Sequence, residues 1–461
     1  MQYDFDVAII GGGSGGYAAA RTAACAGLKT VVIEGAEEIG GLCILHGCMP
    51  TKALLYAAER LQIARDSKVW GVDSQNVTFD FAKAMARKNT LIQSFADDRR
   101  NGLLSGKFKF LRARARFLDP HTVELNTGEH IKAAHFVIAT GSIVAPPPLP
   151  QLADIGYLTS DDALKLTACP KTLIVLGGGA IGCEFSQFMH RFGAKVTLVQ
   201  RSPHVLHEFD ADAAKTIETV FRREGVKLYT GTKLLDAKRD GKMKTVLFEH
   251  DGQTVSVSAE EVLFALGRRA NTASLGLENA GVKLNGGRIK TNEFMQTSAP
   301  HIYAAGDCTG PHDIVHIAVL QGETAGQNIA KNGSRKMDDR LFLEVVFTDP
   351  HVAQAGLTEK QAQAKKIPYI AASYPFNDHG KSLIMEANDG FVKLLANPES
   401  GEIIGGACVG PAGGELIHEI VLAMATRMTV QEFALIPHYH PTLAEIWTYP
   451  AEELAAKIPN H

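Results

Sequence analysis

The sequence predicts an α/β protein with two parallel-sheet domains and a separate α+β domain at the C-terminal end. Two stretches carry the first part of this prediction, because a strand, a glycine-rich turn and a helix follow one another near residue 11 and again near residue 177. From about residue 342 the pattern changes to short strands that alternate with short helices. Strands linked by helices favour a parallel sheet, whereas the later pattern favours a domain of its own.

The first glycine turn lies in a complete strand–turn–helix–strand unit. A β-branched strand at residues 6–10 leads into the glycine loop 11–16, a helix over 17–26 and a second strand over 29–33, which Glu34 follows. A glycine loop without this context is a weak signal, but the four parts together are typical of a Rossmann-like dinucleotide-binding domain.

Each residue of this loop has a physical reason to be there. In the loop, which also contains Ser14, Gly11 permits the tight turn and Gly13 lets the backbone approach a pyrophosphate. Gly16 lets the helix pack closely on the strand, and Glu34 can accept hydrogen bonds from ribose hydroxyls. The first domain is therefore expected to bind a dinucleotide.

A second unit of the same kind begins with a strand over 172–176. Its loop contains the expected cofactor-binding residues Gly177, Gly179 and Ile181. At the end of its second strand the acid is absent, and Gln200, Arg201 and Ser202 stand there instead. The arginine and the serine can receive a ribose 2′-phosphate, which favours NADPH over NADH, although Arg201 is equally compatible with a solvated surface charge.

Three further strands run into glycine turns. The first turn contains Thr140 and Gly141, the second contains Gly267, and the third contains Gly306 and Asp307. A plain strand with a capping Asp is the alternative for Asp307. Residues 108–117 and 121–125 are expected to form small strands. The Pro-rich stretch 145–150 is a stiff connector and marks a boundary. We divide the chain into the segments 1–150, 151–270, 271–338 and 339–461.

Two cysteines, Cys43 and Cys48, lie five positions apart, with Pro50 just after them. Residues 53–65 favour a helix, so Cys48 lies at or just before a helix N-terminus. Backbone N–H groups and the helix dipole favour an anionic sulfur there, which suits a dithiol that opens and closes. On these residues alone, two ordinary cysteines or a structural disulfide stay open as alternatives.

The composition excludes several classes of function. The chain has 461 residues, 45% hydrophobic and 21% charged, as expected for a soluble globular protein with large cores. A net charge of -3 gives no electrostatic reason to expect nucleic acid or membrane partners, and no signal peptide or membrane span is apparent. The seven scattered cysteines favour a reducing, cytoplasmic setting. The basic stretch 88–116, helix-prone in its first part, is interpreted as a solvated face.

A last polar cluster lies near the C-terminal end. His440, with Glu445 five residues on, could form a base and its orienting partner. A histidine pair such as His438 and His440 could also bind metal, but no cysteine or third histidine stands nearby at ligand spacing. We therefore expect no metal site; a plain core or turn histidine is the other alternative.

Together these motifs resemble class I of the FAD-dependent pyridine nucleotide-disulfide oxidoreductases, over essentially the whole chain. Six motifs occur in the order of that family: the Gly11 turn, the Cys43/Cys48 box that ends in Pro50 and Lys52, the Thr140-Gly141 turn, the Gly177 turn, the Gly306-Asp307 element and the segment that begins at His440.

The resemblance implies two cofactors. FAD would lie in the first nucleotide fold, formed by segments 1–150 and 271–338, and NADPH or NADH in segment 151–270. Glu34 would bind the adenosine ribose of FAD, and Asp307 would lie near its ribityl chain. Lys52 and Glu184 occupy the positions that pair beside the flavin in relatives.

The resemblance also implies different roles for the two sulfurs. Cys48 would face the flavin as a thiolate, and Cys43 would exchange with the substrate. His440, oriented by Glu445, would be the acid and base at the dithiol, contributed by the partner subunit. Segment 339–461 would then be the interface domain of a homodimer.

The substrate is the least constrained part of the resemblance. Segments 347–350, 410–415 and 440–445 look like lipoamide dehydrogenase, which makes a lipoyl group, small or protein-bound, the leading substrate. Residues 201–202 and 427–433 look like mercuric reductase, although that enzyme's C-terminal cysteine pair is missing here. Another NADPH-dependent disulfide reductase, a flavin diaphorase and a structural subunit of a multienzyme complex stay open as alternatives. Three residues of the cysteine box also depart from the commonest family pattern: Leu42, Leu45 and His46.

Overall fold

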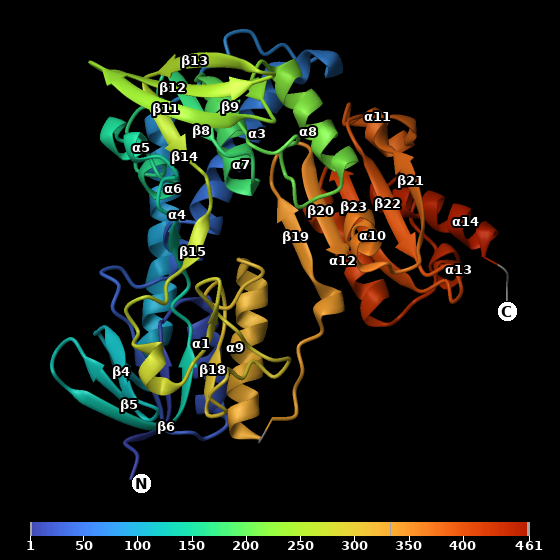
Figure 1. Ribbon diagram of the computed structural model, residues 1–461. Coiled ribbons are helices and arrows are strands. Elements are labelled where there is room, and N and C mark those ends of the chain that lie inside the picture. The colour runs from blue at the N-terminus through green and yellow to red at the C-terminus, as the bar shows by residue number, and fades with distance from the viewer. Residues whose placement is uncertain (1, 332, 459–461) are drawn as a thin grey trace. The chain divides into compact units, whose positions relative to one another are not determined.

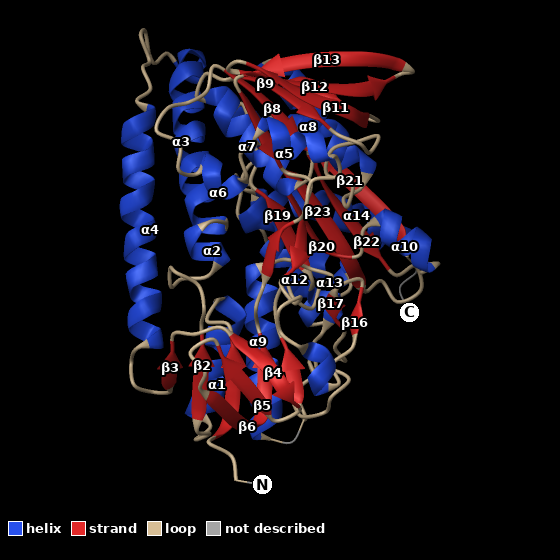
Figure 2. Cartoon of the chain, turned by 60° about the vertical axis from the view of Figure 1, so that its left-hand side comes forward, coloured by secondary structure: helices blue, strands red, loops and turns tan. Residues whose placement is uncertain are grey.

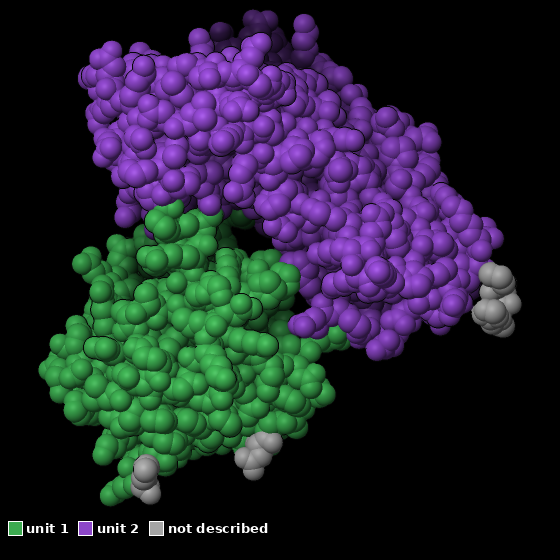
Figure 3. Space-filling model, viewed as in Figure 1, with its two compact units in different colours: residues 1–53, 83–146, 267–338 green, residues 54–82, 147–266, 339–461 purple. Residues whose placement is uncertain are grey.

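The computed structural model describes residues 2–331 and 333–458. They form two compact units, each built from separated parts of the chain (Figure 3). The first unit contains Met1–Ala53, Lys83–Pro146 and Gly267–Asp338, and the second contains Leu54–Ala82, Pro147–Leu266 and Asp339–His461. Among the helices of the described residues, none is long and apolar enough to cross a membrane.

A mainly parallel sheet with β1 near its centre lies in the first unit. The strand order is β3-β2-β1-β6-β5-β4, and β18 also pairs with β6. The strands are β1 (Phe5–Ile10), β2 (Thr30–Ile33), β3 (Lys109–Leu111), β4 (Ala115–Asp119), β5 (Thr122–Leu125), β6 (His130–Ile138) and β18 (Ile302–Ala304). Strand β1 pairs in parallel with both β2 and β6, so the glycine turn after Ile10 leaves the sheet near its middle.

Two helices of this unit, α1 (Ser14–Cys25) and α9 (Val315–Ala330), lie side by side (Figure 1). Small residues make this close packing possible. A Cβ added to Gly322 on α9 would lie 2.1 Å from the carbonyl oxygen of Gly15 on α1. The helices can therefore approach this closely only because residue 322 is glycine.

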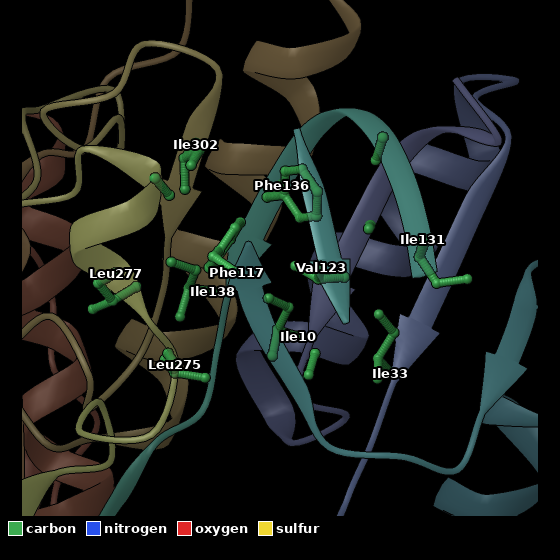
Figure 4. Close-up of a cluster of buried hydrophobic side chains, with 14 of the residues drawn as sticks. Ile10, Ile33, Phe117, Val123, Ile131, Phe136, Ile138, Leu275, Leu277 and Ile302 are labelled. Atoms are coloured by element: carbon green, nitrogen blue, oxygen red, sulfur yellow. The ribbon is translucent and has the colours of Figure 1, made fainter. Parts of the chain in front are cut away.

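The first unit has buried apolar clusters on both faces of its sheet, and Figure 4 shows the one on the face away from α1 and α9. Apolar side chains from β1, β2 and β6 meet those of β4, β5 and the 270–302 segment there. Phe117 and Phe136 pack edge to face, with ring centroids 5.0 Å apart. In this cluster, apolar side chains of segment 267–338 pack against those of the N-terminal part of the unit.

The second glycine turn leaves a four-stranded parallel sheet with the order β10-β9-β8-β14. Its strands are β8 (Thr172–Leu176), β9 (Lys195–Val199), β10 (Lys227–Tyr229) and β14 (Glu261–Phe264). The long helices α7 (Ala180–Arg191) and α8 (Ala211–Glu224) link these strands. A three-stranded antiparallel sheet is inserted before β14 and contains β11 (Lys233–Asp240), β12 (Met243–His250) and β13 (Gln253–Ala259).

The C-terminal part contains a five-stranded antiparallel sheet with the order β19-β20-β23-β22-β21 (Figure 2). Its strands are β19 (Leu343–Val346), β20 (His351–Gly356), β21 (Ile370–Pro375), β22 (Phe391–Ala396) and β23 (Ile403–Gly410). The helices of this part are α10 (Glu359–Lys365), α11 (Gly380–Ile384), α12 (Gly413–Ala425), α13 (Val430–Ala434) and α14 (Thr448–Lys457). Trp447, on the short helix η5 (Ala444–Trp447), is fully buried in the core that they share.

The remaining elements are shorter or connect these parts. The helices are α2 (Leu42–Leu45), α3 (Cys48–Asp66), α4 (Phe81–Leu103), α5 (Pro150–Ile155), α6 (Ser160–Ala163), η1 (Ser67–Trp70), η2 (Leu277–Ala280), η3 (Asp339–Leu341) and η4 (Phe376–Asp378). The strands are β7 (Ser142–Val144), β15 (Arg268–Ala270), β16 (Leu284–Asn285) and β17 (Arg288–Ile289).

The expected strand at 108–117 forms as two strands with different partners. β3 pairs in parallel with β2, whereas β4 pairs antiparallel with β5. Between them the N–H of Ala113 donates to the carbonyl of Glu34, and the N–H of Arg114 donates to the Asn126 side chain. These long-range bonds turn the chain from one sheet partner to the next, and a local hydrophobic pattern contains no sign of them.

Candidate active site

The first glycine turn has the geometry of a cradle for a pyrophosphate. Gly11 has a φ of 106°, and a Cβ there would lie 2.3 Å from the carbonyl oxygen of Ala139. A Cβ on Gly16 would lie 1.8 Å from the carbonyl oxygen of Gly11. At Gly13, the N-cap of α1, the nearest atom to an added Cβ is the Cα of Gly41 at 3.9 Å. The turn is therefore tight at its base and open above the first N–H groups of α1, where an anion binds favourably.

Glu34 lies at the far end of this cradle. Its Oε2 accepts from the N–H of Gly12 at 2.7 Å, and its Oε1 accepts from the N–H of Ala36 at 2.8 Å. The carboxylate is thus fixed by two backbone donors and keeps lone pairs for further donors such as ribose hydroxyls. These residues fit the adenosine end of a dinucleotide.

Asp307 is a buried carboxylate in the same unit. Burial raises its pKa, while a hydrogen bond from Ser142, with 2.6 Å between Oγ and Oδ2, acts in the opposite direction. Arg268 donates from Nε to the Ser142 hydroxyl at 2.9 Å, and Arg288 donates to the Asp307 carbonyl at 2.9 Å. Asp307 is held in place by its neighbours and still offers an acceptor to a polyhydroxyl chain.

Hydrogen bonds to distant residues also fix the predicted turns at Gly141 and Gly306. Thr140 donates from Oγ1 to the carbonyl of Asn271 at 2.8 Å, and the N–H of Asn271 donates to Gly141 at 2.9 Å. Gly141 has a φ of 67°. The N–H of Gly306 donates to Gln321 at 2.7 Å, so the predicted turns at Gly141 and Gly306 are both fixed by tertiary hydrogen bonds.

The two cysteines of the box lie on consecutive helices. Cys43 lies on α2, and Cys48 is the first residue of α3, as the sequence predicts. Both are half-buried thiols. A hydrogen bond to the Cys48 sulfur is the largest cause that raises the pKa of Cys43, followed by burial. Such a bond is strongest when Cys43 keeps its proton and Cys48 is the thiolate, which the N-terminus of α3 favours.

Lys52 lies one helical turn beyond Cys48 on α3 and therefore on the same helix face. Glu184, on α7 of the second unit, is buried, and its Oε1 accepts from the N–H of Phe347 at 2.9 Å. Lys52 thus belongs to the first unit, and Glu184 is held by a hydrogen bond within the second unit.

A guanidinium that sequence reasoning missed lies in the same unit as the dithiol. Arg99 on α4 stacks on the ring of Tyr17, with 4.5 Å between its Cζ and the ring centroid. Its Nη1 is buried, and within residues 2–331 and 333–458 it has no hydrogen-bond partner. The charge of Arg99 lowers the pKa of the Cys43 thiol, against the larger effects that raise it. We interpreted its basic segment as a solvated face, and only the tertiary fold reveals that this side chain is half-buried.

The second glycine turn repeats the geometry of the first with a different side chain at its end. Gly177 has a φ of 102°, and a Cβ there would lie 2.3 Å from the carbonyl oxygen of Ala265. An added Cβ on Gly179 would meet nothing within 4 Å, and Ile181 lies in the first turn of α7. The N–H of Gly178 donates to Oε1 of Gln200 at 3.0 Å, as the N–H of Gly12 donates to Glu34 in the first unit.

The Gln200 amide therefore takes the structural place of a carboxylate without its negative charge. Arg201, the next residue, is exposed. Gly267, at the turn after β14, has a φ of 110°, and its carbonyl accepts from the N–H of Ala145 at 3.1 Å. A neutral amide with an adjacent cation does not repel a phosphate on the ribose, as a carboxylate would.

The predicted base and its partner meet in the C-terminal part. Nδ1 of His440 lies 2.9 Å from Oε2 of Glu445. The His440 side chain is 78% exposed, whereas that of Glu445 is 12% exposed. His438 pairs separately with Glu419, with 2.6 Å between Nε2 and Oε1. An exposed imidazole that is fixed by a buried carboxylate can exchange protons with a group outside its own chain. In the part of the chain that the structure describes, no group of three or more His, Cys, Asp or Glu is placed to hold a metal ion.

Two family models match the chain. The model described as pyridine nucleotide-disulphide oxidoreductase matches residues 5–322, and the dimerisation-domain model of the same family matches residues 343–451. The chain is 36% identical to a dihydrolipoyl dehydrogenase of Bacillus subtilis, over 96% of this chain and 97% of that protein. It is 33% identical to a mercuric reductase of Staphylococcus aureus, over 93% of this chain and 78% of that protein.

Solved structures also match over nearly the whole chain. The HOCl-induced flavoprotein disulfide reductase RclA from Escherichia coli matches with a TM-score of 0.86 at 25% identity, over 97% of this chain and 99% of that one. LpdA from Mycobacterium tuberculosis matches with a TM-score of 0.87 at 30% identity, over 97% of this chain and 99% of that one.

Proposed function

Because the chain belongs to the pyridine nucleotide-disulphide oxidoreductase family, whose members are FAD-dependent enzymes, we propose that it moves electrons between NADPH or NADH and a dithiol substrate through Cys43 and Cys48. A lipoyl group is the leading substrate, since dihydrolipoyl dehydrogenases are among its relatives. The observation that carries the proposal is that Cys48 begins α3 and that Cys43, on the preceding helix α2, lies close enough for Cys48 to raise its pKa, in the same unit as the open glycine cradle.

The two nucleotide folds have separate roles in this proposal. Segments 1–150 and 271–338 hold FAD, with the first N–H groups of α1 at the pyrophosphate, Glu34 at the ribose and Asp307 at the ribityl chain. Segment 151–270 holds the nicotinamide coenzyme through its own glycine turn. Bound FAD accepts a hydride as a two-electron unit and passes both electrons on, which the chain's own side chains cannot do.

The protein's residues then handle the sulfur chemistry. In the direction of disulfide reduction, His440 of the partner subunit, which Glu445 orients, takes the proton of Cys43. The resulting Cys43 thiolate attacks a substrate sulfur, which breaks the substrate disulfide and forms a mixed disulfide with Cys43. His440 then returns the proton to the leaving thiolate. Cys48 then attacks the Cys43 sulfur, releases the second thiol and closes the Cys43–Cys48 disulfide. Dithiol oxidation runs the same steps in reverse.

Segment 339–461 is the interface of a homodimer in this proposal. The match to a dimerisation domain over residues 343–451 supports it, as does the exposure of His440. An acid and base on the surface of its own chain is accessible to a dithiol of another subunit.

One experiment tests this function against its alternatives. The purified enzyme is reduced anaerobically with NADH or NADPH while its absorption spectrum is recorded. It is then assayed with lipoamide, glutathione disulfide and Hg(II). The proposal predicts turnover with lipoamide and a long-wavelength band from a thiolate beside the flavin. Turnover with glutathione disulfide alone would favour another NADPH-dependent disulfide reductase, and turnover with Hg(II) alone a mercuric reductase. Reduction of quinones without any disulfide activity would favour a diaphorase.

We predict that Arg201 makes the enzyme prefer NADPH. Substitution of Arg201 by Ala should lower kcat/KM for NADPH about tenfold, which corresponds to about 1.4 kcal/mol for one charge–phosphate contact, with little change for NADH. Steady-state kinetics with both coenzymes measure the ratio. Arg222, an exposed arginine of α8 that pairs with Glu218, offers the control Arg222→Ala. Equal kinetics of the Arg201 variant and the wild type would show that Arg201 is a solvated surface charge.

Arg99 is predicted to make Cys43 easier to ionise. In Arg99→Met the pKa of Cys43 should rise, because a nearby cation that stabilises the thiolate is lost. A charge effect of about 1 kcal/mol would slow alkylation of Cys43 about fivefold at a fixed pH below that pKa. The rate is measured on the reduced enzyme by mass spectrometry. Arg99→Lys should restore part of it, whereas Arg100→Met, at an exposed neighbour, should change nothing. An unchanged rate in Arg99→Met would contradict the prediction.

A further inference from the structure

A buried histidine lies on the other side of the carboxylate that orients His440. His379 is fully buried, and its Nε2 lies 3.4 Å from Oε1 of Glu445. Oε2 of the same carboxylate lies 2.9 Å from Nδ1 of His440. Glu445 therefore stands between two imidazoles and presents one oxygen to each.

The backbone and side chain of His379 are held from several directions. His379 is the N-cap of α11, and its carbonyl accepts from the N–H of Leu383 at 3.0 Å. Nδ1 lies 2.8 Å from the hydroxyl of Ser382 on the same helix. Two aromatic rings meet the imidazole edge to face: Phe376, with centroids 6.4 Å apart, and Tyr449, with centroids 6.3 Å apart. The imidazole therefore has little freedom to turn.

This geometry selects one tautomer. A carboxylate is an acceptor only, so the nitrogen that faces it must carry a hydrogen. Nε2 of His379 is then the donor, and Nδ1 accepts from the Ser382 hydroxyl. Burial lowers the pKa of His379, and His440 acts in the same direction against the opposing effect of Glu445, which favours the neutral ring with a single N–H.

The contact between His379 and Glu445 is longer than a good hydrogen bond. Among the described residues, Nε2 has no partner at hydrogen-bond geometry, although the atom is buried. A buried unpaired donor is unfavourable, so it has a reason to pair with the one carboxylate beside it. Hydrogen bonds of this kind are often long in a resting protein and shorten when the reaction partners are in place.

We propose that His379 is a positioning residue, whose Nε2–H holds Oε1 of Glu445 so that Oε2 stays aimed at Nδ1 of His440. The inference rests on the proposed function, in which His440 is the acid and base. The charged and titratable groups that face His379 are Glu445 and His440, with the phenol of Tyr449 against its ring. Without His379 the carboxylate can turn toward solvent, and His440 loses its fixed tautomer.

Two substitutions of similar shape test the inference. In His379→Gln the amide nitrogen takes the place of Nε2 and keeps a donor, whereas His379→Met has the same length without one. With lipoamide as substrate, His379→Met should lower kcat about tenfold, the lower end of the range found when groups that orient a metal-binding histidine are removed. His379→Gln should recover most of the rate. Reduction of ferricyanide by NADH or NADPH should be unchanged in both, which shows that FAD and the fold are intact.

Three outcomes of these assays distinguish the positioning role of His379 from the proposed function of the enzyme. Equal lipoamide rates for His379→Met and His379→Gln would overturn the positioning role, whether both rates are high or low. His440→Gln in the same assay tests the proposed function itself, which fails if that variant keeps the wild-type rate. A loss in His440→Gln without a loss in His379→Met overturns only the present inference.

A spectroscopic measurement on the wild-type protein needs no substitution that could fail to fold. In the ¹⁵N-histidine-labelled enzyme, the ring nitrogens of His379 should show a protonated Nε2 and an unprotonated Nδ1, with His440 in the opposite tautomer. The signals are assigned by their absence from His379→Gln and His440→Gln. A protonated Nδ1 on His379 would overturn the proposal.

Discussion

Cys43→Ser is expected to lower lipoamide turnover by about a thousandfold or more, while reduction of ferricyanide by NADH or NADPH continues at the wild-type rate. A serine hydroxyl cannot form a disulfide, so neither the mixed disulfide nor the closed pair can exist. Electrons can still reach a one-electron acceptor from the flavin. Stopped-flow and steady-state assays on the same preparation measure both activities.

The serine variant of each cysteine should give a different spectrum. Cys43→Ser keeps Cys48 at the N-terminus of α3, so the long-wavelength thiolate band should persist without an added reductant. In Cys48→Ser the band should be absent, since the remaining sulfur lies on α2. Cys25→Ser, at an exposed cysteine of α1, is the matched control and should change neither activity nor spectrum. Full lipoamide activity in Cys43→Ser would refute the proposed mechanism.

His440→Gln is expected to lower lipoamide turnover by about a hundredfold to ten-thousandfold, the range of general acid–base catalysis. The exposed side chain contributes little to the fold, so the free energy of unfolding should change by less than about 0.5 kcal/mol. Thermal unfolding and the ferricyanide assay check that expectation. The loss should be greatest with substrates whose leaving thiol has a high pKa, because such a thiol needs the proton most.

The neighbouring histidine provides the control for this prediction. His438 also pairs with a carboxylate, but its partner is Glu419 and its side chain is buried. His438→Gln should therefore affect stability and leave the disulfide step intact in the enzyme that remains folded. Similar losses of kcat per folded enzyme in both variants would show that the segment acts through its structure, rather than through a proton on His440.

Local sequence was sufficient for much of the site. The two glycine turns were predicted from their strand–turn–helix context, and the structure places Gly11 and Gly177 where only a residue without a Cβ fits. Cys48 at a helix N-terminus and the pairing of His440 with Glu445 were also predicted, since both follow from residues close in sequence. Such motifs can be predicted because the local backbone conformation determines how residues close in sequence lie relative to one another.

The parts that could not be predicted depend on residues far apart in the chain. His379 and Glu445 are separated by sixty-six positions in the sequence, 445 minus 379, yet their side chains meet, with His379 between η4 and α11 and Glu445 on η5. Arg99 belongs to a basic stretch whose pattern gives no sign that one guanidinium stacks on Tyr17. Gln200 looked like the loss of an acid, whereas the structure shows its amide in the acid's place. Each of these contacts exists only in the folded chain.

The most direct test of the central claim is a count of thiols during a single reduction. The oxidised enzyme is given one equivalent of NADPH or NADH under anaerobic conditions and alkylated, and the modified cysteines are identified by mass spectrometry. If electrons pass through the proposed pair, new alkylation should appear at Cys43 and Cys48, and the other five cysteines should be unchanged. Reduction of the flavin with no new alkylation at Cys43 or Cys48 would contradict the account.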